Sequence, residues 1–186
     1  MTERDRMVKG LPYNPYDKAL IRARGRARQI LRRIAEIPED KERQRKHFFK
    51  ELFAETGQRF LIENPFICDY GSNIYWGENA YANFGCIILD AAPVYIGKNV
   101  MLAPAVKIFT ATHPVEHEAR NSGIEFAKEI RIGDNVWVGG GAIINPGVTI
   151  GNNSVIGSGS VVTKDIPENV VAAGNPCRII REIKTH

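Results

Sequence analysis

Long hydrophobic runs, paired cysteines and a strong net charge are all missing from this chain of 186 residues. No apolar stretch could span a bilayer and the first residues carry no signal-peptide pattern, so we expect a cytoplasmic protein with no membrane partner. The three cysteines, Cys68, Cys86 and Cys177, are odd in number and far apart, which is typical of reduced thiols rather than of a disulfide framework. A net charge of +4 permits an anionic ligand and does not require nucleic acid.

Proline is absent between Asp17 and Glu36, where apolar residues recur at helical spacing. Pro38 interrupts this pattern, and Glu39–Glu55 predicts a second helix, so we expect a helical hairpin as a separate element over residues 1–58. The first helix carries a run of arginines, Arg22, Arg24, Arg26, Arg28, Arg32 and Arg33. Aromatic stacking partners are not interleaved with them, so we interpret the run as a solvated helix face, with a nucleic-acid patch as the rival.

Residues 130–162 repeat a unit of six residues. Every sixth position is a branched aliphatic: Ile132, Val138, Ile144, Ile150, Ile156 and Val162. Two positions earlier in each unit stand Ile130, Val136, Ala142, Val148, Ser154 and Ser160. Two same-face positions per six residues predict short strands joined by tight turns. Ordering one unit costs about 6–12 kcal/mol and burying one aliphatic returns about 1.5–3 kcal/mol, so the units must stack; we predict a mainly β domain, a parallel β-helix, over residues 59–186.

The same phase appears earlier, in rougher form, at Trp76, Ala82 and Ile88, and more cleanly at Ile96, Leu102 and Ile108. The step from Ile88 to Ile96 is eight residues, so we expect an insertion near Ala91–Pro93. Residues 110–129 are polar and off the pattern, which predicts a loop leaving the coil. After residue 162 we expect a final strand at Val170–Ala173 and a C-terminal cap.

The predicted loop at residues 110–129 contains His113, followed by Pro114. A neutral imidazole can accept a proton from an alcohol that attacks an activated acyl carbon, so His113 is a candidate general base; the alternative is a solvated histidine. Glu125 lies in the same loop and is a further candidate, for bonding the hydroxyls of such an alcohol. Excursions from a rigid scaffold often carry function.

Seven short motifs stand out along the chain. They are Tyr-Ala-Asn-Phe (81–84), Leu-Asp (89–90), Thr-Ala-Thr-His-Pro (110–114), Arg-Asn-Ser-Gly (120–123), Asn-Pro-Gly-Val-Thr-Ile-Gly (145–151), Val-Thr-Lys-Asp (162–165) and Gly-Asn-Pro-Cys-Arg (174–178). Together they resemble the sugar branch of the hexapeptide-repeat acyltransferases. The resemblance covers nearly the whole chain and implies a left-handed β-helix. It points to maltose and galactoside O-acetyltransferases and their nodulation relatives. Ala91 stands where galactoside-specific members carry an acidic residue, so the chain looks closer to the maltose branch.

The resemblance implies direct transfer of an acetyl group from acetyl-CoA to a hydroxyl of maltose, glucose or a related sugar, in a ternary complex. His113 would be the general base, and Asn83 would stabilise the developing oxyanion. The N-terminal helical element would help to bind the acceptor, and the carboxylates would bond its hydroxyls. The acceptor ligands it implies are Asp17, Asp69, Asn83 and Asp90, although Asp90 could instead only hold its own turn.

For coenzyme A, the resemblance implies that the pantetheine arm lies along the β-helix. The residues lining it would be Trp137, Gly140, Ser158, Thr163 and Lys164, and Arg178 and Arg181 would reach the phosphates. Gly139–Gly141 is not followed by the Lys-Ser/Thr of a P-loop, so we interpret it as a smooth surface for the arm. The resemblance also implies a homotrimer with the acceptor site between subunits, and no metal requirement.

Three other functions stay open on the sequence. The acceptor could be another hydroxyl compound, such as an antibiotic or serine. A zinc-dependent hydratase on the same fold could use His113 and His117, although a catalytic zinc usually has three protein ligands. The arginine run could bind nucleic acid. Cys86, close in sequence to Asn83, could form a covalent intermediate or be a core thiol.

Overall fold

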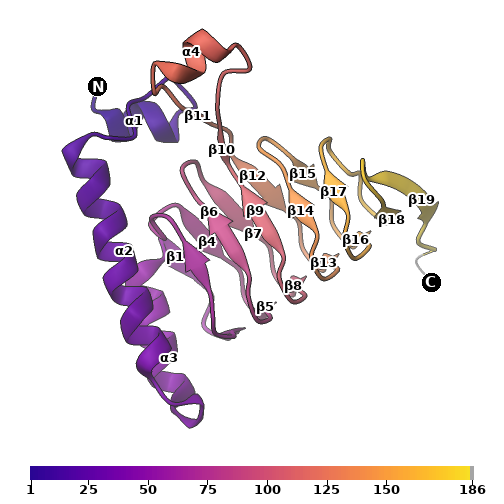
Figure 1. Cartoon of the computed structure of the whole chain (residues 1–186). Coiled ribbons are helices and arrows are strands. Elements are labelled where there is room, and N and C mark those ends of the chain that lie inside the picture. The colour runs from indigo at the N-terminus through magenta and orange to yellow at the C-terminus, as the bar shows by residue number, and fades with distance from the viewer. Residues whose placement is uncertain (185–186) are drawn as a thin grey trace.

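Three sheets form the sides of a prism in the computed structural model, which describes residues 1–184, and helices cover its N-terminal end (Figure 1). Their strands are parallel, except that the last strand of the second sheet is antiparallel to its neighbour. Face 1 consists of β1 (Glu55–Thr56), β4 (Ile74–Trp76), β7 (Val94–Ile96), β12 (Ile130–Ile132) and β15 (Thr149–Ile150). Face 2 consists of β2 (Phe60–Ile62), β5 (Ala80–Ala82), β8 (Met101–Leu102), β13 (Trp137–Val138), β16 (Val155–Ile156), β18 (Val170–Ala173) and β19 (Arg178–Glu182). Face 3 consists of β3 (Ile67–Cys68), β6 (Ile87–Leu89), β9 (Lys107–Phe109), β14 (Ile143–Ile144) and β17 (Val161–Val162).

The chain visits the faces in the fixed order 1, 2, 3, so every coil has three corners. We call the stacked corners edge 1–2, edge 2–3 and edge 3–1, after the faces that they join. Edge 2–3 contains the turns at 83–86, 103–106, 139–142 and 157–160. Edge 3–1 contains those at 69–73, 90–93, 110–129, 145–148 and 163–165.

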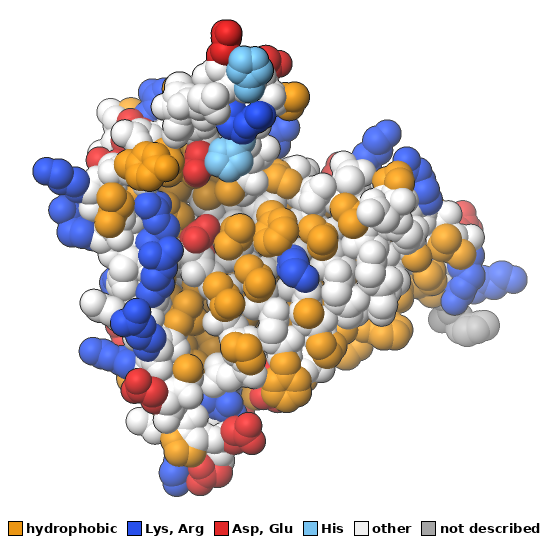
Figure 2. All heavy atoms as spheres, in the orientation of Figure 1, with side chains coloured by type: hydrophobic (Ala, Val, Ile, Leu, Met, Phe, Trp, Pro, Cys, Tyr) orange, Lys and Arg blue, Asp and Glu red, His pale blue; other side chains and the backbone are white. Residues whose placement is uncertain are grey.

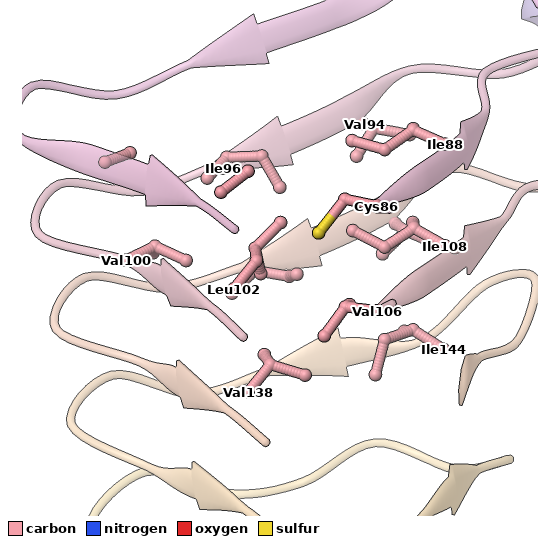
Figure 3. Close-up of a cluster of buried hydrophobic side chains, with 14 of the residues drawn as sticks. Cys86, Ile88, Val94, Ile96, Val100, Leu102, Val106, Ile108, Val138 and Ile144 are labelled. Carbon is pink, nitrogen blue, oxygen red and sulfur yellow. The ribbon is translucent and has the colours of Figure 1, made fainter. Parts of the chain in front are cut away.

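The six-residue period is confirmed as the repeat of a parallel β-helix. All twelve aliphatic and small positions predicted to point inward between residues 130 and 162 are buried. Strands of successive coils pair in exact register, as in Ile144 with Ile108 and Val162. Figure 3 shows the resulting column, in which Val100, Leu102, Val106, Ile108, Val138 and Ile144 point into the prism. The two serines of the pattern are also buried, and each hydroxyl donates to a backbone carbonyl: Ser154 to Pro167 and Ser160 to Gly157.

Edge 1–2 is held by a ladder of asparagines. Each has a positive φ between 55° and 60°, which asparagine tolerates better than most residues. Each side-chain amide donates to the next one, at 2.9–3.2 Å between Nδ2 and Oδ1. The ladder consists of Asn79, Asn99, Asn135, Asn153 and Asn169. No residue predicted to take part in catalysis or coenzyme binding lies on this edge.

The N-terminal helices pack onto the same core as the coils. Helix α2 (Lys18–Glu36) begins at Asp17, whose carboxylate caps it by accepting from the amides of Ala19 and Leu20. Helix α3 (Glu42–Leu52) is shorter than predicted, because residues 39–41 form a 3₁₀ turn and the helix ends before Phe53. A short helix α1 (Glu3–Val8) precedes them, with a capping box at Thr2 that was not predicted. No helix among residues 1–184 is long and apolar enough to cross a membrane.

The predicted excursion leaves edge 3–1 between β9 and β12, and is visible above the prism in Figure 1. It is more ordered than a plain loop. Its two ends pair as the antiparallel strands β10 (Ala111–Thr112) and β11 (Phe126–Ala127), and its tip carries the short helix α4 (His117–Asn121). The backbone of Glu125 also pairs with that of Tyr13, so the excursion is fastened to the N-terminal segment.

Candidate functional site

Two adjoining pockets lie where the excursion, the N-terminal segment and edge 3–1 meet. One has a volume of about 230 Å³ and is lined by Tyr13, Pro15, Tyr16, Arg24, Arg28, Asp69, Tyr70, Ala91, Ala111 and Glu125. The other has about 210 Å³ and is lined by Pro15, Tyr16, His113, Arg120, Gly123 and Glu125. They share Pro15, Tyr16 and Glu125. The site therefore combines an imidazole with carboxylates, phenols and guanidinium groups over a short distance.

Asp69 offers its carboxylate to the larger pocket, whereas Asp90 does not. The Asp90 side chain is 0% exposed, and it accepts hydrogen bonds from the amides of Asp69, Tyr70 and Asn73. Burial raises the pKa of Asp90 to about 7, although these amides act in the opposite direction. The prediction that Asp90 binds the acceptor is therefore corrected. Asp90 holds the turn that presents Asp69, the second of the two roles considered for it.

Asp69 has no hydrogen-bond partner for its side chain among residues 1–184. Burial raises its pKa, while Arg24 and Arg28 lower it. The Arg24 guanidinium makes two other hydrogen bonds: it donates to the Tyr70 hydroxyl at 2.6 Å and to the Pro15 carbonyl at 2.7 Å. The sequence interpretation of the arginine run as a solvated face missed Arg24 and Arg28. Their spacing of four residues, which places them on one side of α2, was the available signal.

Tyr13 lines the larger pocket, and Glu125 lines both. The buried Tyr13 hydroxyl donates to Oε2 of Glu125 at 2.7 Å. Burial and the neighbouring Glu125 carboxylate raise the pKa of Tyr13 far above its ordinary value, so the phenol stays protonated and donates. Nothing in the sequence pattern predicted this contact, since Tyr13 and Glu125 are 112 positions apart.

His113 stands at the end of β10 with its side chain exposed toward the smaller pocket. Asp17, the other predicted acceptor ligand at this edge, caps α2 with one carboxylate oxygen, and it lines neither pocket. Its neighbour Tyr16 lines both and is 73% exposed. The N-terminal segment thus contributes to the site chiefly through Tyr13, Pro15 and Tyr16.

Asn83 lies at the other side of face 3 from His113. It follows β5 on edge 2–3, where its Oδ1 accepts from the amide of Phe84 at 2.8 Å. A strand of face 3 with its turns, about five residues, separates the two edges, which corresponds to roughly 16 Å. The structure of one chain therefore keeps the predicted base and the predicted oxyanion donor apart.

The predicted coenzyme-binding residues are divided by face 3 in the same way. Trp137, 48% exposed on face 2, lies beside edge 2–3, where Gly140 and Ser158 occupy turns of successive coils. Gly139 allows these coils to approach, because a Cβ there would lie 2.5 Å from the Ser158 nitrogen. Gly141 has a φ of 69° and open space above it, so the strip along this edge is smooth. The structure therefore shows closely spaced coils along edge 2–3, beside the exposed ring of Trp137.

Thr163 and Lys164 lie on edge 3–1 instead, in the exposed turn after β17. Arg178 and Arg181 are exposed on the C-terminal strand β19, and their guanidinium groups donate to the carbonyls of Cys177 and Glu182. Each guanidinium retains further N–H groups for an anion.

Cys86 is a core residue. It is fully buried, its thiol donates weakly to the Ala103 carbonyl, and burial raises its pKa to about 11. His117 lies at the start of α4, and within the described part of the chain no group of three or more His, Cys, Asp or Glu side chains is arranged to hold a metal ion. A separate groove of about 750 Å³ runs over face 1, where Tyr75, Tyr95 and Arg131 stack on one another; it contains none of the predicted site residues.

Two family models match the sequence. The one described as maltose acetyltransferase hexapeptide capping motif covers residues 6–57, and the bacterial transferase hexapeptide model, with six repeats, covers residues 129–164. The first corresponds to the helical N-terminal region and its approach to the pocket. The second corresponds to the most regular coils.

The chain is also similar to characterised and solved proteins over its full length. It is 46% identical to nodulation protein L of Rhizobium meliloti strain 1021 over 178 residues, which cover 96% of this chain and 97% of that protein. The structure superposes on a maltose O-acetyltransferase from Clostridium difficile 630 with a TM-score of 0.98 and 49% identity, covering 100% of this chain and 99% of the other. A galactoside acetyltransferase in complex with coenzyme A gives a TM-score of 0.95 and 45% identity, covering 99% and 92%.

Proposed function

This chain belongs to the maltose and galactoside O-acetyltransferase family of hexapeptide-repeat acetyltransferases, and we propose that it transfers the acetyl group of acetyl-CoA to a hydroxyl of maltose, glucose or a related sugar. One observation carries the proposal: an exposed histidine lines one of two small adjoining pockets, which together contain two carboxylates and three phenols. Such groups accept and donate hydrogen bonds to the adjacent hydroxyls of a polyol. The pocket volumes, about 230 and 210 Å³, suit a compact acceptor.

In the proposed reaction, the sugar hydroxyl gives its proton to His113 as its oxygen attacks the thioester carbon. The tetrahedral intermediate then collapses, the carbon–sulfur bond breaks, and the imidazolium returns the proton to the leaving thiolate. The transfer is direct. The burial of Cys86 and the raised pKa of its thiol support this, because an acyl-enzyme would need an accessible thiolate.

The oxyanion donor in this proposal is Asn83 of a neighbouring subunit. His113 of one copy and Asn83 of the next meet if edge 3–1 of one copy packs against edge 2–3 of its neighbour. A contact between two different surfaces repeats in one rotational sense, and where the rotation closes it forms a ring rather than a two-fold dimer. A three-sided prism suits a ring of three, so we propose a homotrimer.

The surface of face 3 supports this arrangement. Its outward positions form one aligned row, Ile67, Ile87, Lys107, Ile143 and Val161, of which all but Lys107 are aliphatic. Figure 2 shows hydrophobic side chains gathered over β6, β9 and β14, with a row of basic side chains along α2 at the left. Ile67 is 48% exposed in the single chain. A row of exposed aliphatic side chains is typical of a surface that a neighbouring copy covers.

Acetyl-CoA fits the same arrangement. The arm would run along the smooth strip of edge 2–3, past Trp137, Gly140 and Ser158, and Thr163 and Lys164 of the adjacent copy would close the groove. Arg178 and Arg181 would hold the phosphates through charge-assisted hydrogen bonds. In this proposal, the acceptor site and the coenzyme site are each formed by edge 3–1 of one copy and edge 2–3 of its neighbour.

The test is release of free thiol from acetyl-CoA with maltose, glucose, a galactoside or no acceptor, using wild type and His113→Ala in parallel. We expect sugar-dependent release that falls about 100-fold or more in the variant. Equal release from both proteins would remove His113 from the mechanism. If no sugar supports release, antibiotic hydroxyls and serine become the acceptors to examine. Cys86→Ser should retain activity, and its inactivity in a folded protein would contradict direct transfer.

A further inference from the structure

The pairing register of the excursion places Glu125 opposite His113. In the β10–β11 hairpin, Ala111 pairs with Ala127 and Thr112 with Phe126, so the next pair in register is His113 with Glu125. Both side chains line the pocket of about 210 Å³. Glu125 and Ala111 also line the adjoining pocket, as expected if alternate residues of the hairpin face the same side.

The backbone of Glu125 determines what kind of pair this is. Its N–H donates to the Tyr13 carbonyl and its carbonyl accepts from the Tyr13 N–H, each at 3.1 Å. Both groups therefore point away from His113. In an antiparallel ladder such a position is a non-hydrogen-bonded pair, in which the two Cα atoms are about 4.5 Å apart and the side chains lie close together.

The two oxygens of the Glu125 carboxylate differ in their hydrogen bonding. Oε2 accepts from the Tyr13 hydroxyl at 2.7 Å, and Oε1 has no hydrogen-bond partner within residues 1–184. Tyr13 is buried, so it fixes the carboxylate against the wall of the pocket. The other oxygen of this anchored carboxylate is thus left without a partner among the described residues, in a side chain that lines the same pocket as His113.

On the basis of the proposed function, we infer that Glu125 is a positioning residue for His113: its free carboxylate oxygen accepts one ring N–H and leaves the other ring nitrogen free to take the proton of the acceptor hydroxyl. Tyr13, Glu125 and His113 then form a hydrogen-bonded chain in which the carboxylate selects the tautomer and stabilises the imidazolium. The same logic orients catalytic histidines in unrelated folds.

Other charged groups also face this imidazole. Arg120 of α4 lines the same pocket and donates to the carbonyls of Pro114 and Val115. Asp69, Arg24 and Arg28 line the adjoining pocket. The two arginines lower the pKa of Asp69, so the negative charge of this carboxylate is offset by their positive charges. Glu125 is the carboxylate that the hairpin register brings to His113, so its removal should dominate the change at the ring.

The decisive variant is Glu125→Gln, which keeps size and an acceptor for Tyr13 but presents an NH₂ group to the histidine. The histidine ring would then have to accept on that side and would carry its proton toward the acceptor, in the wrong tautomer for a base. We expect kcat to fall about 10-fold or more, with KM for acetyl-CoA within twofold of wild type. Glu118→Gln, which removes a carboxylate from α4 on the same excursion, is the matched control and should behave as wild type.

An NMR measurement of the His113 ring nitrogens, assigned with His113→Ala, separates positioning from a general structural effect. We expect their chemical shifts to show one neutral tautomer in wild type and the other in Glu125→Gln, because the carboxylate accepts a ring N–H whereas the amide donates to the ring. An unchanged tautomer in the variant would overturn the inference, and so would a raised KM for the sugar with normal kcat, which would make Glu125 an acceptor ligand. Inactivity of the wild type with every acceptor would contradict the proposed function, and the tautomer would still decide the role of Glu125.

Discussion

Edge 2–3 and edge 3–1 of the same β-helix differ in regularity. On edge 2–3 the turns at 139–142 and 157–160 follow one plan, with glycines that let one coil lie on the next. On edge 3–1 no two of the first three turns are alike, and the third expands into the excursion of residues 110–129. A regular edge makes a long smooth strip, whereas an irregular edge makes a pocket. The comparison suggests that the repeat supplies the coenzyme surface and departures from the repeat supply the acceptor site.

The largest effect is expected from removing the carboxylate that shapes edge 3–1. Asp90→Ala leaves two buried amides and one part-buried amide without an acceptor, at about 1–3 kcal/mol each before relaxation. We expect a loss of roughly 3 kcal/mol, which corresponds to a melting temperature lower by about 6–12 °C. Thermal unfolding followed by circular dichroism measures it. KM for the sugar should rise, since the turn presents Asp69.

Asp90→Asn is the control, because it retains one acceptor oxygen and should lose less stability than Asp90→Ala. Equal melting temperatures for Asp90→Ala and wild type would contradict the role assigned to this carboxylate.

Edge 2–3 is expected to be sensitive at Gly139. The added methyl of Gly139→Ala would meet the Ser158 nitrogen at 2.5 Å, so neighbouring coils must shift, which costs about 1–3 kcal/mol. We expect a lower melting temperature and a higher KM for acetyl-CoA, with the sugar KM little changed. Gly25→Ala, in the interior of α2 with open space around it, should instead stabilise the protein slightly. A neutral result at Gly139 would mean that coil spacing does not shape this strip.

Trp137 should affect the coenzyme alone. Its exposed ring contributes an aromatic contact of about 0.5–1.5 kcal/mol, so Trp137→Ala should raise KM for acetyl-CoA about twofold to tenfold. Steady-state kinetics with each substrate varied in turn distinguishes this from a loss of sugar binding. Tyr75→Ala on face 1 is the matched aromatic control and should leave both KM values unchanged. If Trp137→Ala raised only the KM for the sugar, the ring would belong to the acceptor site and not to the coenzyme site.

Edge 1–2 should respond in stability only, with the smallest effect on activity. Asn135→Gly keeps the positive φ and removes two ladder bonds, at about 0.5–1.5 kcal/mol each. Asn135→Ala adds the strain of a left-handed conformation and should cost about 1–2 kcal/mol more. Chemical denaturation compares the two variants. A loss of activity in folded Asn135→Gly would show that this edge also serves the site.

The repeat could be predicted because its signal is local. Every sixth residue between Ile132 and Val162 reports a buried position, and the start of α2 at Asp17 follows from a capping residue before a helical pattern. The contact of Tyr13 with Glu125 has no periodic signal, because it joins segments that only the folded excursion brings together. Asp90 illustrates the same limit: its residue type suggested a ligand, and only its burial revealed a structural carboxylate.

Complementation between two inactive variants tests the central claim, that edge 3–1 of one copy and edge 2–3 of the next form one site. His113→Ala and Asn83→Ala are prepared separately, then unfolded and refolded together in equal amounts, with each variant refolded alone as the control. If the site joins two copies of a ring, random mixing gives each interface an intact His113 and an intact Asn83 about one time in four. We therefore predict recovery of roughly a quarter of wild-type activity. No recovery in a mixture whose mixed oligomers are verified by mass spectrometry would contradict the account.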